Sequence, residues 1–300
     1  MKTVLKLGTR GSKLALIQAE SVRAKLTALD PSLTIEIIPI QTEGDINKTQ
    51  PLHEIGGKGV FIKTLEDALV SHEIDAAIHS VKDVTSTLSA DTELISFLAP
   101  EARTDCLVSQ VGRCYSCLED IPQGFSIATS SLRRKAILAH LRPDIIIKDI
   151  RGNVQTRIQK CRDGYADGVL LSTAGVMRLG MHEDISLQLA PQQFIPAPGQ
   201  GVVGVQIRQT DIELKPLFSS IGCDYQKECH FFEHYVVSNV GLDCNYPLGV
   251  YVCCDNGNVI MDVCWATLDC AHYFSETITG DYQSIMPKLD TLIAKIKHIL

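Results

Sequence analysis

The chain has 300 residues, a formal net charge of −7 and 45% hydrophobic residues, which is typical of a soluble globular protein. Three hundred residues exceed the length at which one hydrophobic core usually stops growing, so we expect two or three domains. The acidic balance argues against a general nucleic-acid binder, whose affinity depends on a broad basic surface. Any anionic ligand must therefore be held by a local cluster of basic side chains.

No stretch predicts an export signal or a membrane span. The first twenty residues include Lys2, Lys6, Arg10 and Lys13 and lack the uninterrupted apolar segment of a signal peptide. No run approaches the roughly 18 apolar residues that cross a bilayer. We therefore expect a cytoplasmic protein whose cysteines are reduced.

Cysteine is frequent, with eleven in the chain and seven of them between positions 223 and 270. Cys114-x-x-Cys117 is half of a zinc motif, but no second pair follows at the spacing of a zinc finger, so we expect no metal. The cysteines in the apolar stretches 250–254 and 259–265, and Cys270, are expected to be small buried side chains.

Strand-like and helical patterns alternate over the first two thirds of the chain. In the first hundred residues we expect strands at 4–7, 35–40, 76–78 and 94–98, and helices at about 14–29 and 61–69. The alternation continues with strands at 126–128, 145–147 and 169–171, and helices at 132–141 and 154–161. Such alternation predicts α/β lobes with mixed, mostly parallel sheets covered on both faces.

The pattern changes after residue 194. Residues 196–201 are rich in Pro and Gly, and the apolar run 202–207 is expected to return to the first lobe. Lobe 1 then comprises 1–100 with 197–220, and lobe 2 comprises 104–194. A helix leading to Cys244, β-type runs at 250–254 and 259–265, and a closing helix at 283–298 predict a small α+β domain over 223–300.

The segment most informative about chemistry is 128–134, Ala-Thr-Ser-Ser-Leu-Arg-Arg. A buried strand leads into Thr129 and Ser131, which are expected to cap the next helix. The free backbone N–H groups at the start of that helix and the guanidinium groups of Arg133 and Arg134 then point at one place. Carboxylate or phosphate suits that arrangement. Taken alone, the segment is equally consistent with a helix N-cap followed by two solvated arginines.

Two further basic turns favour the anion site. Arg151 to Arg157 repeats the device after the next strand, and Arg10 with Ser12 supplies a matching turn in the first lobe. Loops at the carboxyl ends of parallel strands share one rim, so these turns are expected to act together.

An acidic residue also follows a buried strand, in His79-Ser80-Val81-Lys82-Asp83. An ionised Asp83 in a cleft would stabilise a positively charged intermediate. Without further context, a surface aspartate paired with Lys82 is the simpler interpretation.

Together these segments resemble the porphobilinogen deaminase (hydroxymethylbilane synthase) family. The matching motifs have the order and spacing of the family, and the resemblance covers about residues 4 to 251. They are Gly8-Thr9-Arg10-Gly11-Ser12, Gly56-Gly57-Lys58-Gly59, His79-Ser80-Val81-Lys82-Asp83-Val84, Thr129-Ser130-Ser131-Leu132-Arg133-Arg134, Arg151-Gly152-Asn153-Val154-Gln155-Thr156-Arg157 and Pro198-Gly199-Gln200-Gly201.

The resemblance implies two lobes folded like a type II periplasmic binding protein and a third domain that carries the cofactor. It implies a transferase that deaminates porphobilinogen and joins four molecules head to tail on a dipyrromethane primer. The product is hydroxymethylbilane, a precursor in tetrapyrrole and heme synthesis. We expect a monomer with one covalent dipyrromethane per chain and a small-molecule substrate, and no nucleic acid or membrane partner.

The resemblance also assigns residue roles. Asp83 matches the catalytic carboxylate. The cofactor-binding positions are Cys244, which forms the thioether, and Ser80, Lys82, Thr129, Ser131, Arg133, Arg134 and Arg151. The substrate-binding positions are Arg10, Ser12, Arg151, Arg157, Arg178 and Gln200, while Lys58 and Phe61 belong to a mobile loop over the cleft.

The sequence departs from the family at several positions: Glu43 for an Arg, Thr85 for a Pro, Asn239 where an Arg is common, and Leu242-Asp243 for Gly-Gly. Two alternatives follow. One is a degenerate paralogue that binds an anionic tetrapyrrole or a small anion without turnover. The other is a ligand-binding or regulatory protein on the same two-lobed fold. Retention of Asp83 and Cys244 argues against both.

Overall fold

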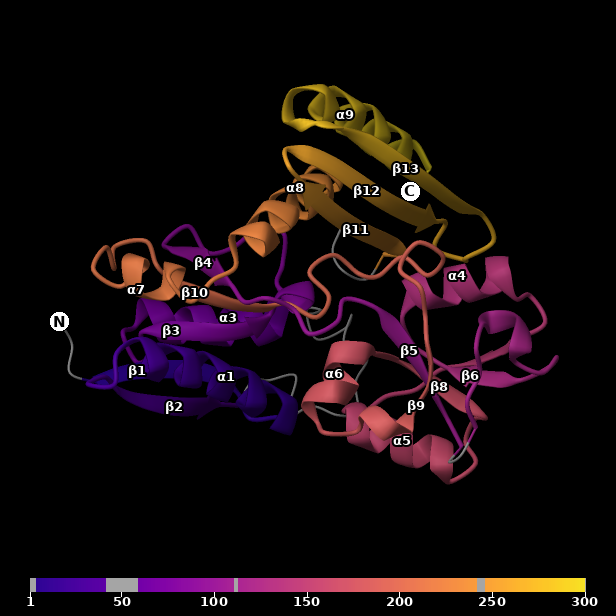
Figure 1. Ribbon diagram of the computed structural model, residues 1–300, viewed down its shortest axis with the longest axis horizontal. Helices are drawn as coiled ribbons and strands as arrows, with labels where there is room; N and C mark the ends of the chain where they lie inside the picture. The colour runs from indigo at the N-terminus through magenta and orange to yellow at the C-terminus, as the bar shows by residue number, and fades with distance from the viewer. Residues whose placement is uncertain (1–3, 42–58, 111–112, 242–245, 300) are drawn as a thin grey trace. The chain divides into compact units, whose positions relative to one another are not determined.

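A computed structural model describes residues 4–41, 59–110, 113–241 and 246–299, with side chains from residue 62 onward in the second range. The chain divides into two compact units, shown in Figure 1. Unit 1 comprises Met1–Pro100 and Val202–Glu228, and unit 2 comprises Glu101–Gly201 and Cys229–Leu300. In the part of the chain described, no helix is long and apolar enough to cross a membrane.

Unit 1 is built on a five-stranded sheet with the order β2-β1-β3-β10-β4. Its strands are β1 (Val4–Arg10), β2 (Thr34–Ile40), β3 (Ala76–Ser80), β4 (Thr92–Phe97) and β10 (Val203–Arg208). Its helices are α1 (Lys13–Leu29), α3 (Gly59–Val70), the short η1 (Val81–Asp83) and α7 (Lys215–Ser219). Neighbouring residues of β3 face opposite ways, so Ile78 packs with Leu26 of α1 and Ala77 packs with Leu65 of α3. The two helices therefore cover opposite faces of the sheet.

Unit 2 contains a second five-stranded sheet with the order β7-β6-β8-β5-β9. Its strands are β5 (Asp105–Ser109), β6 (Ser126–Ala128), β7 (Ile146–Lys148), β8 (Gly168–Ser172) and β9 (Ile185–Gln188). Its helices are α4 (Leu132–Leu141), α5 (Val154–Arg162) and α6 (Thr173–Arg178), with short turns η2 (Leu118–Asp120) and η3 (His182–Asp184).

The same unit holds a three-stranded antiparallel sheet with helices on one face. The strands are β11 (Leu248–Asp255), β12 (Asn258–Ala266) and β13 (Tyr273–Asp281), and the helices are α9 (Tyr282–Ile299) and α8 (Asp224–Val240), which belongs to this unit from Cys229 onward. Alternate residues of β12, Val259, Met261 and Val263, are fully buried and pack with Phe232 of α8 and Leu289 of α9. This alternation is the pattern of a sheet with one covered face.

The predicted fold class is confirmed: two lobes with mixed α/β sheets and a small α+β part. Among the described strands, each five-stranded sheet has two parallel and two antiparallel ladders, fewer parallel ones than the alternation predicted. The fourth strand in each order, β10 or β5, runs opposite to both of its neighbours and accounts for the antiparallel ladders.

Candidate functional site

Four predicted site residues of unit 1 line one small pocket of about 90 Å³. Arg10 ends β1, Ser12 caps α1, Ser80 ends β3 and Asp83 lies in η1. Because β1 and β3 are parallel neighbours, their carboxyl ends bring these side chains to the same edge of the sheet. A guanidinium group, two hydroxyl groups and a carboxylate therefore surround one space.

Hydrogen bonds fix the walls of this pocket. The Ser12 Oγ accepts a hydrogen bond from the Ala15 backbone N at 3.3 Å, as expected of an N-cap. The amide of the buried Gln18 contacts the Ser80 hydroxyl, with Nε2 at 2.8 Å from Oγ. Lys82 and Asp83 are both partly buried in η1.

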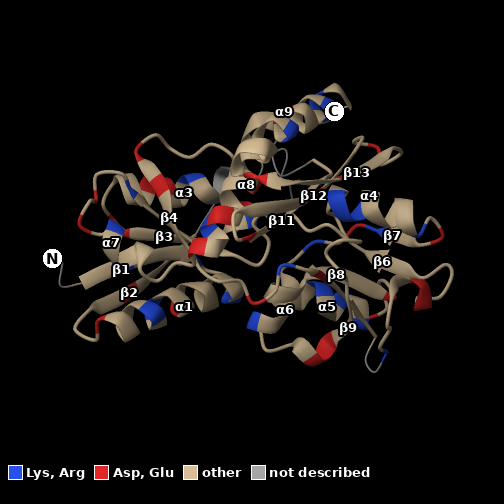
Figure 2. Ribbon diagram, turned by 45° about the horizontal axis from the view of Figure 1, so that its top comes forward, with Lys and Arg blue, Asp and Glu red and all other residues tan. Residues whose placement is uncertain are grey.

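In unit 2, the two predicted basic turns follow neighbouring parallel strands, β6 and β7. Ser131 caps α4, and its Oγ accepts from the Arg134 backbone N at 3.5 Å. Asn153 caps α5 and accepts from the Thr156 backbone N at 2.8 Å. Both helices carry basic residues, which Figure 2 shows in blue. The exposed Arg151 precedes the second cap, so the turns place polar donors at one sheet edge.

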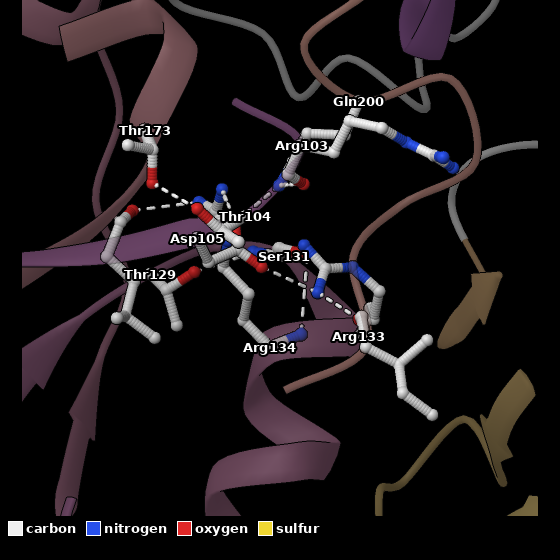
Figure 3. Close-up of polar contacts among 11 residues, drawn as sticks. Arg103, Thr104, Asp105, Thr129, Ser131, Arg133, Arg134, Thr173 and Gln200 are labelled. Atoms are coloured by element: carbon white, nitrogen blue, oxygen red, sulfur yellow. Dashed lines mark hydrogen bonds and ion pairs between the residues drawn. The ribbon is translucent and has the colours of Figure 1, made fainter. Parts of the chain in front are cut away.

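Arg133 and Arg134 both contact Asp105, as Figure 3 shows. Their side chains are only 4% and 8% exposed. Arg134 donates from Nε and Nη2 to Asp105 Oδ1 at 3.1 and 2.7 Å, and Arg133 Nη1 lies 2.8 Å from Asp105 Oδ2. Arg133 also donates to the Ile195 carbonyl and Arg134 to the Leu170 carbonyl. Burial opposes ionisation of Asp105, but the two guanidinium groups hold its pKa well below the usual range.

Gln200 belongs to the same buried cluster. Its Nε2 donates to Asp105 Oδ1 at 3.0 Å and to the Arg103 carbonyl at 3.1 Å, and the residue is 1% exposed. Arg103 in turn forms a buried ion pair with Glu233, which accepts a hydrogen bond from the Gly199 backbone N at 2.8 Å. The Pro/Gly-rich segment is therefore tied to the start of β5 and to α8.

Arg157 and Arg178 each have partners within unit 2. Arg157 Nε donates to the Gly152 carbonyl at 2.7 Å. Arg178 Nη2 donates to the Gly201 carbonyl at 2.6 Å, and its Nε lies 3.5 Å from Glu101. Burial lowers the pKa of Arg178.

Asp105, Arg103 and Glu233 were not predicted from the sequence. Asp105 begins β5, a strand that was not predicted, and its charge directly before an apolar run was the available signal. A carboxylate at the buried end of a strand requires a cationic partner, and Arg133 and Arg134 were the available candidates. The sequence signal for Glu233 was weaker, because a single acidic residue on a helix usually faces solvent.

Several predicted residues lie outside the described part of the chain: Cys244, Lys58, the side chain of Phe61, Glu43 and Leu242-Asp243. Two family departures are described and make local contacts. Thr85 Oγ1 donates to the Thr87 carbonyl at 2.7 Å, and Asn239 Nδ2 donates to the Tyr235 carbonyl at 2.8 Å. Within the described ranges, no group of three or more His, Cys, Asp or Glu side chains could hold a metal ion.

The family model and similar curated proteins point to the same family. Residues 5–216 match the family model for porphobilinogen deaminase, dipyromethane cofactor binding domain. A porphobilinogen deaminase of Chromobacterium violaceum is 39% identical over 255 residues, which cover 85% of this chain and 82% of that one. One from Limosilactobacillus reuteri is 37% identical over 294 residues, covering 97% and 96%. Among solved structures, the BenM effector binding domain with its effector benzoate aligns with 76% of this chain and 94% of its own, at 14% identity and a TM-score of 0.45.

Proposed function

We propose a mechanism for this chain, which belongs to the porphobilinogen deaminase family (EC 2.5.1.61). Members of this family carry a dipyrromethane cofactor and serve tetrapyrrole synthesis. The observation that carries the mechanism is the pocket of unit 1, where Arg10, Ser12, Ser80 and Asp83 surround one space. A carboxylate beside a guanidinium suits a substrate that has both a cationic amine and carboxylates.

Asp83 is proposed to stabilise positive charge. When ammonia leaves porphobilinogen, the remaining pyrrole carries a positive charge, and a fixed carboxylate lowers the free energy of that state. The same carboxylate accepts hydrogen bonds from pyrrole N–H groups. Arg10 and Ser12 are proposed to bind the acetate or propionate of the substrate through charge-assisted hydrogen bonds.

The residues of unit 2 fit a cofactor that bears carboxylates. Thr129 and Ser131 supply hydroxyl groups, and Arg151 and Arg157 supply guanidinium groups, on turns that follow the neighbouring strands β6 and β7. When bound, dipyrromethane would supply the free pyrrole carbon from which the chain is started. A thioether to Cys244 is proposed to hold it, because a tethered acceptor makes each addition effectively intramolecular.

Arg133, Arg134 and Gln200 are proposed to hold the 129–134 turn in place. Their contacts with the fully buried Asp105 support this positioning role. Lys82, Arg178 and Ser80 remain proposed contacts of the cofactor or substrate on the strength of the family match. Lys58 and Phe61 are proposed to form the loop over the cleft on the same ground.

The intact mass of the purified protein tests the cofactor assignment. Protein from cells that make porphobilinogen is expected to exceed its sequence mass by two pyrrole units, and Cys244→Ser is expected to lack that increment. Cys253→Ser serves as the matched control and should keep the adduct. An unmodified wild type would overturn the assignment and favour the degenerate paralogue.

Asp83→Asn tests the role of the carboxylate. This variant is expected to keep the adduct and to lose turnover by about a hundredfold or more, since only the negative charge is removed. Asp91→Asn, an exposed aspartate of the same unit, is the control. Turnover of Asp83→Asn within a few-fold of wild type would refute the role.

The monomeric state and cytoplasmic location are part of the same proposal. Analytical ultracentrifugation of the holoprotein should give one species of about 33 kDa, matching the chain mass of 32.9 kDa. A species of twice that mass would exclude the monomer.

A further inference from the structure

A row of buried polar side chains lies on the face of the unit 1 sheet that α3 covers. His79 of β3, Gln206 of β10 and Thr92 of β4 are 4%, 0% and 3% exposed. His79 pairs with Gly204 of β10, which lies two residues before Gln206. Gln206 in turn pairs with Leu94 of β4, which lies two residues after Thr92. Side chains at such diagonal positions share a face and can touch.

Glu66 of α3 anchors this row. Its Oε1 accepts hydrogen bonds from the Ser89 backbone N at 2.9 Å and from Gln206 Nε2 at 2.7 Å. Gln206 Nε2 also donates to Thr92 Oγ1 at 2.7 Å. A carboxylate only accepts hydrogen bonds, so the Gln206 amide must present its nitrogen to Glu66. Its oxygen is thereby left facing His79.

This orientation decides the tautomer of His79. The Gln206 Oε1 lies 2.9 Å from His79 Nε2, and an amide oxygen can only accept. The hydrogen must therefore be on Nε2, which makes Nδ1 the hydrogen-bond acceptor of the neutral ring. Burial lowers the pKa of His79 to about 4, although Gln206 and Asp83 both favour the charged form. Among the described charged groups, Asp83 of η1 and Arg10 of β1 line the same pocket as His79, and Glu66 of α3 is linked to the ring through Gln206.

His79 also lines the pocket that holds Arg10, Ser80 and Asp83. We propose that His79 binds an N–H group of the substrate through Nδ1, with Gln206 and Glu66 as the positioning residues that fix its tautomer. This inference rests on the proposed function and extends it: His79 Nδ1 then adds a neutral ring acceptor to the Asp83 carboxylate for a substrate rich in N–H donors.

A neutral acceptor complements the carboxylate. An imidazolium at this position would pair with Asp83 and cancel the negative charge that a cationic intermediate needs. A neutral Nε2–H ring adds a directional contact without adding charge. The buried row thus leaves the charge of Asp83 intact while it orients the ring.

The tautomer is measured directly by ¹⁵N NMR of the histidine-labelled holoenzyme, with the His79 signals assigned by their loss in His79→Gln. The expected result at pH 7 is a neutral ring protonated on Nε2, and Gln206→Met should shift the ring toward a mixture of tautomers. A ring protonated on Nδ1, or an imidazolium at pH 7, would overturn the proposal.

Steady-state kinetics tests the contact itself. His79→Gln keeps an amide within reach of Gln206 but has no atom at the Nδ1 position, so KM for porphobilinogen should rise roughly tenfold, the effect of one lost hydrogen bond. His79→Asn places an amide near the Nδ1 position and should recover part of that loss. Gln206→Met should raise KM as well.

A destabilised control separates binding from packing. Ser186→Ala removes buried hydrogen bonds to Ser109 in unit 2, at 2.7 and 3.0 Å, and should lower the melting temperature while KM stays within twofold. An unchanged KM in His79→Gln, or an equal rise in Ser186→Ala, would refute the proposal. A wild type without adduct or turnover would refute the proposed function instead, and the tautomer measurement would stand in either case.

Discussion

Replacing Asp105 by asparagine is expected to lower the free energy of unfolding by about 3 kcal/mol, at the lower end of the range for breaking a buried ion pair. The carboxylate is completely buried, and it contacts two guanidinium groups whose side chains are 4% and 8% exposed. Asparagine keeps the size and one acceptor oxygen, so lost packing contributes little. Arg133 and Arg134 each keep a backbone carbonyl, at Ile195 and Leu170, which moderates the loss.

Urea unfolding at pH 7 measures this difference. Asp149→Asn is the matched control, because Asp149 is 71% exposed and pairs with Lys135 at 2.8 Å. An exposed pair contributes at most about 1 kcal/mol. If Asp105→Asn were no less stable than Asp149→Asn, the buried cluster would not stabilise the fold and the reasoning would fail.

The pH dependence gives a second measurement of the same cluster. The pKa of Asp105 is depressed in the folded state, below its ordinary value of 3.8. Its contribution is therefore fully present above that ordinary value and is lost as the pH falls toward the folded pKa. The stability difference between wild type and Asp105→Asn should stay constant from pH 8 to pH 5 and shrink below about pH 4. A difference that widens in acid would contradict the assignment.

Two further predictions concern the backbone and the thiols. Gly201→Ala should destabilise the protein by about 1–3 kcal/mol more than Gly180→Ala in thermal melts, because an added Cβ would lie 2.1 Å from the Ala102 carbonyl oxygen but would meet nothing within 4 Å at Gly180. The φ angle is positive at both glycines, so equal melting temperatures would contradict the steric argument. Iodoacetamide at pH 8 should label the exposed Cys114 well before Cys264, since burial raises the pKa of Cys264 to about 11 and leaves roughly one thiolate in a thousand. Peptide mass spectrometry of the folded protein measures both rates, and similar labelling would show that Cys264 is accessible.

The sequence by itself determined the local structure. Short-range signals placed the strands that end at Arg10, Ser80 and Ala128, and they predicted the cap at Ser131, because a cap bonds to a backbone group only a few residues away. Apolar periodicity also located most of the helices, since each covers one face of a sheet. The strands β5, β9 and β13 were not predicted; β13 buries little apart from Ile278 and so lacks a clear apolar alternation.

Only the tertiary structure decided the partners of the polar groups. From the sequence, the two further basic turns favoured ligand-binding roles for Arg133 and Arg134, but nothing indicated that both side chains contact Asp105 of β5. The tautomer of His79 depends on Gln206, which lies 127 residues away in the chain. Burial makes each such pairing obligatory, because an unpaired polar group inside a protein costs several kcal/mol. The identity of the partner is nevertheless set by which strands become neighbours, and local sequence does not encode that.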